Sequence, residues 1–251
     1  MDKENRDRGY RIYVAQSDVQ VDAALRLRAD VFAGEENYLT QEGCPGGREG
    51  DSRDFDERTI HVLVEHPDDG VVGVGRLEIR PPLAGTGFSS FGFALERSYD
   101  LRVLALLAVQ PVAEVSRVAV RRRHRGAGGA TRHLIYELGR QAVAAGARYW
   151  VGDANCETPS AWAARDIYTR LRELGLISHI PFALREPPVE LAPRRPSDAS
   201  LCELPHILTS YERTARVRFA GYPHLDPKFG RYAIGFIADP RFAVTRCRPW
   251  P

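Results

Sequence analysis

The sequence predicts a mixed α/β domain in which helices flank a mostly antiparallel sheet. Ile60, Val62 and Val64 recur at every second position, and the turn Asp68-Asp69-Gly70 leads into a second strand at residues 71–80, which is the pattern of a β-hairpin. Downstream, strand-like runs alternate with amphipathic helical segments. The chain has 251 residues, 43% hydrophobic and 27% charged, so it can bury the core of one large domain or two small ones.

The first half of the chain is expected to open with a strand at residues 10–15 and a helix at about 19–32 that Asp18 caps. Residues 34–56 lose all periodicity and form a Gly- and acid-rich stretch. This stretch is long for a connection, so we interpret it as a loop that contacts substrate. The hairpin follows, and the apolar run at residues 101–109 has no period that assigns it.

The second half is expected to centre on a strand at residues 113–120, a basic turn at 121–129 and a helix to about Ala145. A strand at residues 149–154 follows. Thr158 and Pro159 then resemble the start of a helix, which ends at Gly175.

Three parts of the chain are distinguished by composition. Residues 10–184 are expected to form the core, and the prolines and charges of residues 185–200 indicate an exposed linker or loop. Residues 201–251 are expected to add a helix and two strands that complete the sheet.

Charge and cysteine content exclude several classes of protein. The 35 basic and 33 acidic residues leave a net charge of +2, which does not favour a nucleic-acid partner. No apolar run reaches the length of a transmembrane segment, although contact with a membrane surface stays open. The four cysteines are far apart in the sequence and predict neither a metal site nor a disulfide framework, so we expect a cytoplasmic protein with reduced thiols: Cys44, Cys156, Cys202 and Cys247.

The strongest local motif is VAVRRRHRGAGGA at residues 118–130, between a predicted strand and a predicted helix. Glycines let backbone N–H groups turn toward a ligand, and a helix N-terminus adds positive potential, so the motif is suited to a pyrophosphate. A thioester carrier with a pantetheine arm supplies such a group, whereas an ordinary basic helix entry is the alternative. The candidate donor-binding residues are Val118, Val120, Arg123, Arg125, Gly126, Ala127, Gly128, Gly129 and Ala130. The arginines of residues 121–125 could meet coenzyme A phosphates or an acidic acyl carrier protein.

This spacing on a strand-turn-helix unit resembles the acyl-donor loop of the GNAT acyltransferases. Further motifs, taken in order, are similar to the acyl-homoserine-lactone synthases and more closely to the N-acyl amino acid synthases and ornithine lipid N-acyltransferases. These motifs are Arg28 with Phe32, Tyr38, the acidic stretch 51–56, residues 61–64, Val72-Gly73, Arg76-Leu77, residues 114–117, and the tail around residues 219–238.

The resemblance implies a GNAT fold whose sheet splays near Glu114 into a V-shaped cleft. It also implies an N-acyltransferase that moves an acyl group from an acyl carrier protein or acyl-CoA thioester to the amine of an amino-acid-like acceptor, by direct attack and with no tightly bound cofactor or metal. The matching positions that would line the cleft are Arg28, Phe32, Tyr38, Asp56, Arg76, Glu114 and Arg117. Arg53 stands where relatives usually carry an acid, and Tyr38 stands where they often carry Trp.

Glu114 is the candidate proton acceptor for the attacking amine. Its structural alternative is an ion pair with Arg117 or Arg76. Strict strand alternation would put Glu114 and Arg117 on opposite faces, so a shared cleft requires a bulge or splay, which we predict. Arg28, Arg76 and Arg117 could hold an acceptor carboxylate or order the acidic loop.

Three further polar residues are candidates for a catalytic or substrate-binding role, and each also has a purely structural interpretation. Tyr168 resembles the tyrosine that protonates the leaving thiolate in many GNAT enzymes, or it is a half-buried core residue. Asn155, with Asp153, lies at a strand end beside the expected cleft, where such residues often only cap the strand.

Two rival functions stay open at this point. One is an acetyl-CoA-dependent N-acetyltransferase of a small metabolite, which a narrow acyl pocket would favour. The other is a non-catalytic GNAT module that binds acyl-thioesters, against which Glu114 and the glycine turn argue.

Overall fold

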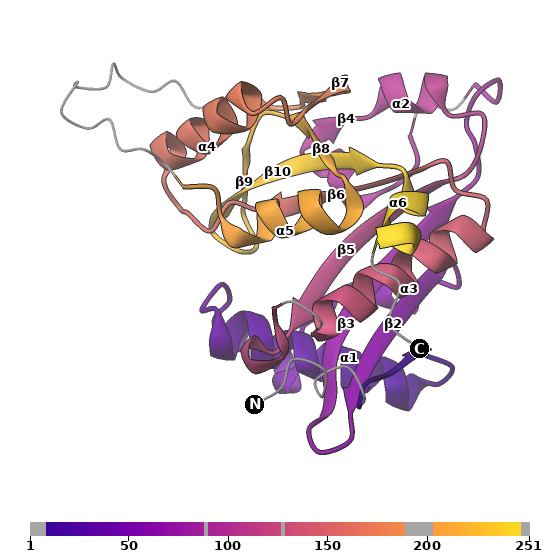
Figure 1. Ribbon diagram of the computed structural model, residues 1–251, viewed down its shortest axis with the longest axis vertical. Coiled ribbons are helices and arrows are strands. Elements are labelled where there is room, and N and C mark those ends of the chain that lie inside the picture. The colour runs from indigo at the N-terminus through magenta and orange to yellow at the C-terminus, as the bar shows by residue number, and fades with distance from the viewer. Residues whose placement is uncertain (1–8, 88–89, 127–128, 189–202, 247–251) are drawn as a thin grey trace.

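The computed structural model of the protein describes residues 9–87, 90–126, 129–188 and 203–246. Its ten strands form one sheet in the order β1-β2-β3-β5-β6-β10-β8-β7-β4, with β9 paired to β10 (Figure 1). Among the strands of the described residues, only the pairs β5–β6 and β7–β8 are parallel. The predicted mixed, mostly antiparallel sheet is therefore confirmed. The strands are β1 Arg11–Val14, β2 Thr59–His66, β3 Gly70–Arg80, β4 Tyr99–Asp100, β5 Val112–Val120, β6 Tyr149–Asn155, β7 Ile177–Leu184, β8 Arg218–Gly221, β9 His224–Asp226 and β10 Arg231–Ala238.

Helices cover both faces of this sheet. The α-helices are α1 Asp18–Ala29, α2 Arg102–Leu107, α3 Ala130–Ala144, α4 Ala161–Glu173, α5 His206–Ala215 and α6 Pro240–Arg246. A π-helical segment, η2 Asp30–Glu35, prolongs α1. The short 3-10 helices are η3 Gln41–Gly43, η4 Pro45–Gly47, η5 Ser52–Phe55, η6 Ala94–Arg97 and η7 Arg122–His124.

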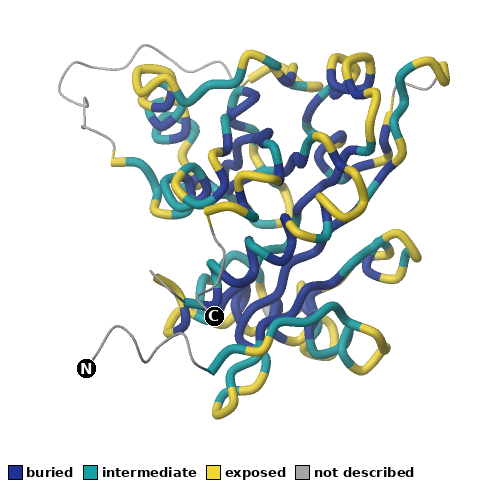
Figure 2. Tube along the Cα trace, turned by 45° about the vertical axis from the view of Figure 1, so that its right-hand side comes forward, coloured by how far each residue is buried: buried dark blue, intermediate teal, exposed yellow. Residues whose placement is uncertain are grey.

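The hairpin β2–β3 is buried on both faces, which explains why its inner residues are almost all apolar. Val62 and Val64 pack with Leu134 and Leu138 of α3, whereas Leu63 packs on the opposite face with α1. Figure 2 shows the buried residues following the strands through the molecule, while the loop tips stay exposed.

The sheet splays after Glu114. β5 pairs with β6 only from Val112↔Tyr149 to Glu114↔Val151, and beyond that point β6 pairs with β10 while β5 continues along β3 (Figure 1). Gly152 lies at the fork, where a Cβ atom would come within 2.4 Å of the carbonyl oxygen of Val115. The predicted V-shaped opening is confirmed.

The predicted bulge lies in the same strand. β3 advances two residues from Val74 to Arg76, whereas β5 advances three between their partners, Ala119 and Ser116. The extra residue is Arg117, whose φ of 54° is in the left-handed region. The bulge turns Arg117 to the same opening as Glu114.

Several element boundaries differ from the sequence prediction. Ser17, not Asp18, caps α1, because its side chain accepts a hydrogen bond from Gln20 N. Thr158 and Pro159 precede the helix start, and Ser160 caps α4 at Ala163 N.

Other segments contain helices or strands that the sequence analysis did not predict. The run at residues 101–109 contains the short helix α2, and β7 was not foreseen. Among the described C-terminal residues α5 is followed by β8, β9, β10 and α6, so two strands were too few. Residues 189–200 of the expected linker lie outside the described part of the chain.

Replacing Gly152 by Ala tests the packing at the fork. The added methyl group meets Val115 O and the Phe236 ring, so we expect the free energy of unfolding to fall by about 1–3 kcal/mol. Urea unfolding measures it. Gly34→Ala is the matched control, because nothing lies within 4 Å of its Cβ position. Equal stability of the two variants would contradict this account of the fork.

Candidate active site

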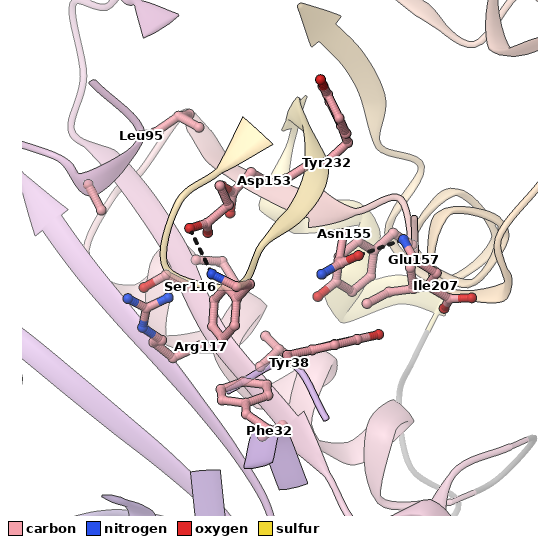
Figure 3. A pocket seen from close by; sticks show the side chains of 18 of the residues that line it. Phe32, Tyr38, Leu95, Ser116, Arg117, Asp153, Asn155, Glu157, Ile207 and Tyr232 are labelled. Carbon is pink, nitrogen blue, oxygen red and sulfur yellow. Dashed lines mark hydrogen bonds between the residues drawn. The ribbon is translucent and has the colours of Figure 1, made fainter. Parts of the chain in front are cut away.

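A cavity of about 980 Å³ occupies the fork between β5 and β6. Its walls come from β5, β6, α5, η6, the η2 region and the segment before β10. Figure 3 shows Phe32 and Tyr38 approaching it from the η2 side and Asp153 and Asn155 from β6. Of the predicted residues, those that line it are Phe32, Tyr38, Arg76, Glu114, Arg117, Val118, Val120, Arg125, Gly126 and Asn155.

Glu114 lies at the apex of the cavity and is 2% exposed. Its two carboxylate oxygens accept hydrogen bonds from Leu95 N at 2.7 Å and Ala94 N at 3.0 Å, at the start of η6. Burial, with the nearby charge of Glu78, raises the pKa of Glu114 to about 7 against these hydrogen bonds. A carboxyl group of that pKa is suited to proton transfer near neutral pH.

The predicted arginines hold the acidic loop. Arg28 makes two hydrogen bonds to Asp54, at 2.7 and 2.8 Å, and contacts Glu49 at 2.7 Å. Arg76 contacts Asp51 at 2.8 Å and Asp54 at 3.1 Å. The arginines were expected either to hold an acceptor carboxylate or to order the acidic loop, and these contacts support the second role. They also argue against the structural alternative for Glu114, an ion pair with Arg76, because Arg76 pairs with other carboxylates.

Arg117 differs from the other two arginines because it also borders the open cavity. It lies 3.4 Å from Glu49 and 3.6 Å from Asp51, and its guanidinium covers the ring of Phe229 at 5.2 Å. One face of Arg117 therefore belongs to the ion network and the other to an aromatic wall.

Asp51 and Asp54, rather than Asp56, join the ion network. Asp56 is not among the lining residues, and its carboxylate accepts a hydrogen bond from Arg58 N while lying 3.9 Å from Arg80. Two acids spaced three apart, with Asp54 accepting a bond from Asp51 N, form a capping box around η5. That spacing was a readable signal in the sequence.

An aromatic cluster closes the cavity beside Arg117. The ring centroids of Phe32 and Phe229 are 5.1 Å apart, and those of Tyr38 and Phe229 are 6.2 Å apart. Burial raises the pKa of Tyr38 to about 12, so its hydroxyl stays protonated at neutral pH. Phe229 was outside the predicted set, although the tail containing it was part of the resemblance.

The glycine turn also borders the cavity. Gly126 has a φ of 112°, which favours glycine, and a Cβ on Gly129 would lie 2.4 Å from His124 O. Gly126 and Thr131 line the cavity, whereas Ala130 is fully buried at the start of α3. Ala127 and Gly128 lie outside the described residues.

The arginines of the turn are paired within the chain. Arg121 contacts Asp30, Arg122 and Arg125 contact Glu36, and Arg123 contacts Asp69. Only Arg125 of these four lines the cavity.

Tyr168 and Asn155 have mainly structural contacts. The Tyr168 ring packs on Tyr222 at 4.9 Å, and Tyr168 is not among the lining residues. Asn155 lines the cavity, but its side-chain oxygen accepts a hydrogen bond from Glu157 N, as in a strand-end cap (Figure 3).

The chain matches a known family over residues 27–134, described as acetyltransferase (GNAT) domain. Residues 27–134, less than half of the chain, thus match a GNAT acetyltransferase domain, and the match supports an enzyme of the acyltransferase class. Within the described ranges, no helix is long and apolar enough to cross a membrane.

Two solved structures are similar over almost the whole chain. BjaI, a CoA-dependent acyl-homoserine lactone synthase solved with MTA, has a TM-score of 0.51 and 19% identity, covering 95% of this chain and 88% of its own. FeeM, an N-acyl amino acid synthase from uncultured soil microbes, has a TM-score of 0.51 and 9% identity, covering 95% and 93%. At these identities the likeness establishes the fold, and the relationship inferred from the motifs is confirmed at that level. No curated protein matches the sequence significantly.

Replacing Asp54 by Asn tests the ion network. Removal of the carboxylate that Arg28 and Arg76 share leaves two buried cations with Glu49 and Asp51 as their nearest remaining carboxylates, so we expect a loss of about 3–5 kcal/mol in unfolding free energy at neutral pH. Asp68→Asn in the exposed hairpin turn is the control. Thermal and urea unfolding measure both.

The stability difference between the wild type and Asp54→Asn should also depend on pH. Burial opposes ionisation of Asp54, but Arg28 and Arg76 outweigh it and hold the pKa of the carboxyl well below its usual range. Its stabilisation is therefore complete above the unfolded pKa, about 3.9, and is lost as pH falls through the folded pKa. The gap between wild type and Asp54→Asn should narrow below about pH 4. A gap that stays constant on acidification would contradict this role.

Proposed function

We propose that this protein transfers an acyl group from a phosphopantetheine thioester to the amine of an amino-acid-like acceptor. The observation that carries the proposal is that one cavity is lined by the glycine turn as well as by Glu114, Arg117 and the aromatic cluster. Likeness of fold to BjaI, also solved with SAM and isopentyl-CoA, and to an N-acyl amino acid synthase supports both substrate classes.

In the proposed reaction the donor phosphates lie against the backbone of the glycine turn and the N-terminus of α3. The acyl-pantetheine arm follows the edge of β5 that β6 has left, where strand N–H groups can polarise the thioester carbonyl. The acceptor nitrogen attacks directly, and Glu114 takes a proton from it. Because a thiolate is a good leaving group, the cavity needs no acid at Tyr168.

The donor is proposed to be acyl-CoA or an acyl carrier protein, which share the pantetheine chemistry. The internal ion pairs of Arg121, Arg122 and Arg123 leave less free charge for an acidic carrier protein, so they favour coenzyme A. A cytoplasmic location and contact with a membrane surface are further parts of the proposal. Leu106 and Val109 near α2, which are 79% and 76% exposed, support the second.

Thiol release tests the function. Acetyl-, octanoyl- and palmitoyl-coenzyme A and the same acyl groups on a carrier protein are assayed with a panel of amino acids and polyamines, and products are identified by mass spectrometry. We expect an amide of a longer acyl group. Amide formation from acetyl-CoA alone would favour the acetyltransferase alternative, and donor binding without turnover would favour the binding module.

Gly129→Ala tests the donor turn. The new methyl group collides with His124 O and displaces the backbone amides, so we expect coenzyme A affinity to fall about tenfold or more, or ~1.4 kcal/mol. Calorimetric titration with coenzyme A measures it, with Gly34→Ala as control and thermal melting to verify folding. Unchanged affinity in the folded variant would remove the turn from the donor site.

Glu114→Gln tests the proton acceptor. We expect turnover to fall roughly a hundredfold to ten-thousandfold, and the acidic limb of the wild-type pH profile, set by the pKa of about 7, to disappear. A side-chain amide facing two backbone donors also loses one hydrogen bond to η6. In the single variant the side-chain NH2 group of the new glutamine faces a backbone N–H donor. The double variant Ala94→Pro with Glu114→Gln removes this donor, since proline has no N–H and suits the first helical position.

The two roles of Glu114 are then separable. Ala94→Pro alone should keep most of the turnover, because it leaves the carboxylate in place. If the double variant recovers normal turnover, Glu114 acts only through η6.

A further inference from the structure

Asp153 and His224 form a second polar pair in the cavity, which sequence motifs did not single out together. Asp153 is on β6, two residues beyond the last β5 pairing, so it shares a sheet face with Val151 and its partner Glu114. His224 begins β9, and its Nε2 lies 3.7 Å from Asp153 Oδ2. Both residues line the cavity, and 36% of the Asp153 side chain is open to water. Glu114 is far less accessible.

Tyr99 fixes the protonation of His224. The Tyr99 hydroxyl has one hydrogen, which it donates to Tyr222 O at 2.7 Å, and it accepts a hydrogen bond from Gly235 N at 3.0 Å. The contact of 3.2 Å between Tyr99 Oη and His224 Nδ1 must then be a bond that Nδ1–H donates. In the neutral ring the other nitrogen, Nε2, carries the lone pair.

Two hydrogen-bond acceptors therefore face each other across the cavity wall. With Asp153 ionised and the ring neutral, the carboxylate and the Nε2 lone pair have no hydrogen between them, and either a proton or an entering donor must supply one. An ammonium group has several N–H bonds and can donate to both at once.

Among the charges around the pair, Asp226 favours a cation there and Arg117 opposes it. The titratable and charged groups that face the pair are Glu114 and Arg117 of β5, Asp226 of β9, Tyr99 of β4 and Tyr211 of α5. Although part of the Asp153 side chain is open to water, burial of the rest, together with Asp226, raises its pKa against the charge of His224, and burial lowers the pKa of His224. Without a ligand, the charged forms of Asp153 and His224 are thus poorly stabilised. A cation bound between them would stabilise the Asp153 carboxylate.

We propose that Asp153 and His224 hold the ammonium group of the acceptor and take its first proton. This inference rests on the proposed function and deepens it by locating the amine. His224 Nε2 receives the proton, the imidazolium is stabilised by the Asp153 carboxylate, and Nδ1–H keeps its bond to Tyr99. The ammonium becomes a neutral amine with a free electron pair.

Two protons must leave the nitrogen, which accounts for two acceptors in one cavity. The neutral amine attacks the thioester carbon, the C–N bond forms, and the C–S bond breaks with its electron pair leaving on sulfur. The second proton passes from nitrogen to Glu114. The products are an amide and a thiolate, and of the two protons one reprotonates the thiolate and one returns to water.

A binding experiment tests the pair without any turnover. In the full-length protein with ¹⁵N-labelled histidine, the His224→Gln variant assigns the His224 ring signals. We expect the Nδ1-protonated tautomer, and we expect methylammonium chloride to shift the Nε2 signal while sodium chloride at equal ionic strength does not. Asp153→Asn should abolish the shift. A protonated Nε2 in the neutral ring, or no response to methylammonium, would overturn the proposal.

Kinetics supply the second test once an acceptor is known. His224→Gln and Asp153→Asn should lower kcat/KM for the amine about tenfold to a hundredfold at neutral pH, with the KM of the donor unchanged. The loss should shrink as pH rises and more amine arrives neutral. Because the second proton must leave the nitrogen at any pH, the loss in Glu114→Gln should persist instead.

Matched controls are His179→Gln, on an exposed position of β7, and Asp68→Asn. If the wild type is active and the Asp153 and His224 variants have the same kcat/KM for the amine as these controls, the proposal is overturned. A wild type that acylates no amine would instead overturn the proposed function, and the methylammonium titration would still decide on the pair.

Discussion

The parallel pairing of β5 with β6 lasts only three residues, and the rest of the site depends on where it stops. Before the fork the two strands share hydrogen bonds, and after it each strand has a partner on one side and open space on the other. Backbone groups on the open edge of β5 are available to a ligand without any loss of sheet structure. The absence of a side chain at Gly152 lets Val115 O approach closely at this point. A small local feature of the backbone thus creates a large cavity.

Charge as well as apolar packing holds the side of the fork formed by β3, β5 and α1 in shape. Arg28 and Arg76 are fully buried, and apart from Glu78 of β3 the carboxylates they contact belong to a loop with little regular structure. Buried ion pairs seldom add much net stability, but they are specific in geometry, which a loop of this kind lacks on its own. The network therefore defines the position of Arg117, which shares its carboxylates and also forms the cavity wall.

Much of the fold could be predicted because periodicity and turn residues encode it locally. The hairpin β2–β3, the strand β5 and the helix α3 are of this kind, and even the bulge followed from requiring Glu114 and Arg117 on one face. Strand β7 escaped prediction because it alternates poorly, and most of its residues are exposed or half-buried. The helix caps were missed by one or two residues, since neighbouring Ser, Asp and Thr side chains compete for the same role.

Sequence motifs could indicate candidate site residues only where a motif stayed together in the sequence. The glycine turn and Glu114 are such cases. His224 and Tyr99 are separated by 125 positions, and only the pairing of β10 with β6, β8 and β9 brings His224 to Asp153. The orientation of a histidine ring by a distant hydroxyl has no sequence signature. Asp56 illustrates the opposite failure, because three aspartates within six residues could not be ranked without their partners.

The pairing of the arginines in the donor turn has a kinetic consequence. Arg121, Arg122, Arg123 and Arg125 each contact an acidic residue of the same chain, so their charges largely cancel at distances beyond the Debye length of about 8 Å. An anionic ligand diffusing toward this face meets little long-range attraction, and its capture is controlled by collision with the opening itself. Association should then be only weakly sensitive to ionic strength, unlike that of proteins which gather their ligands through an extended field.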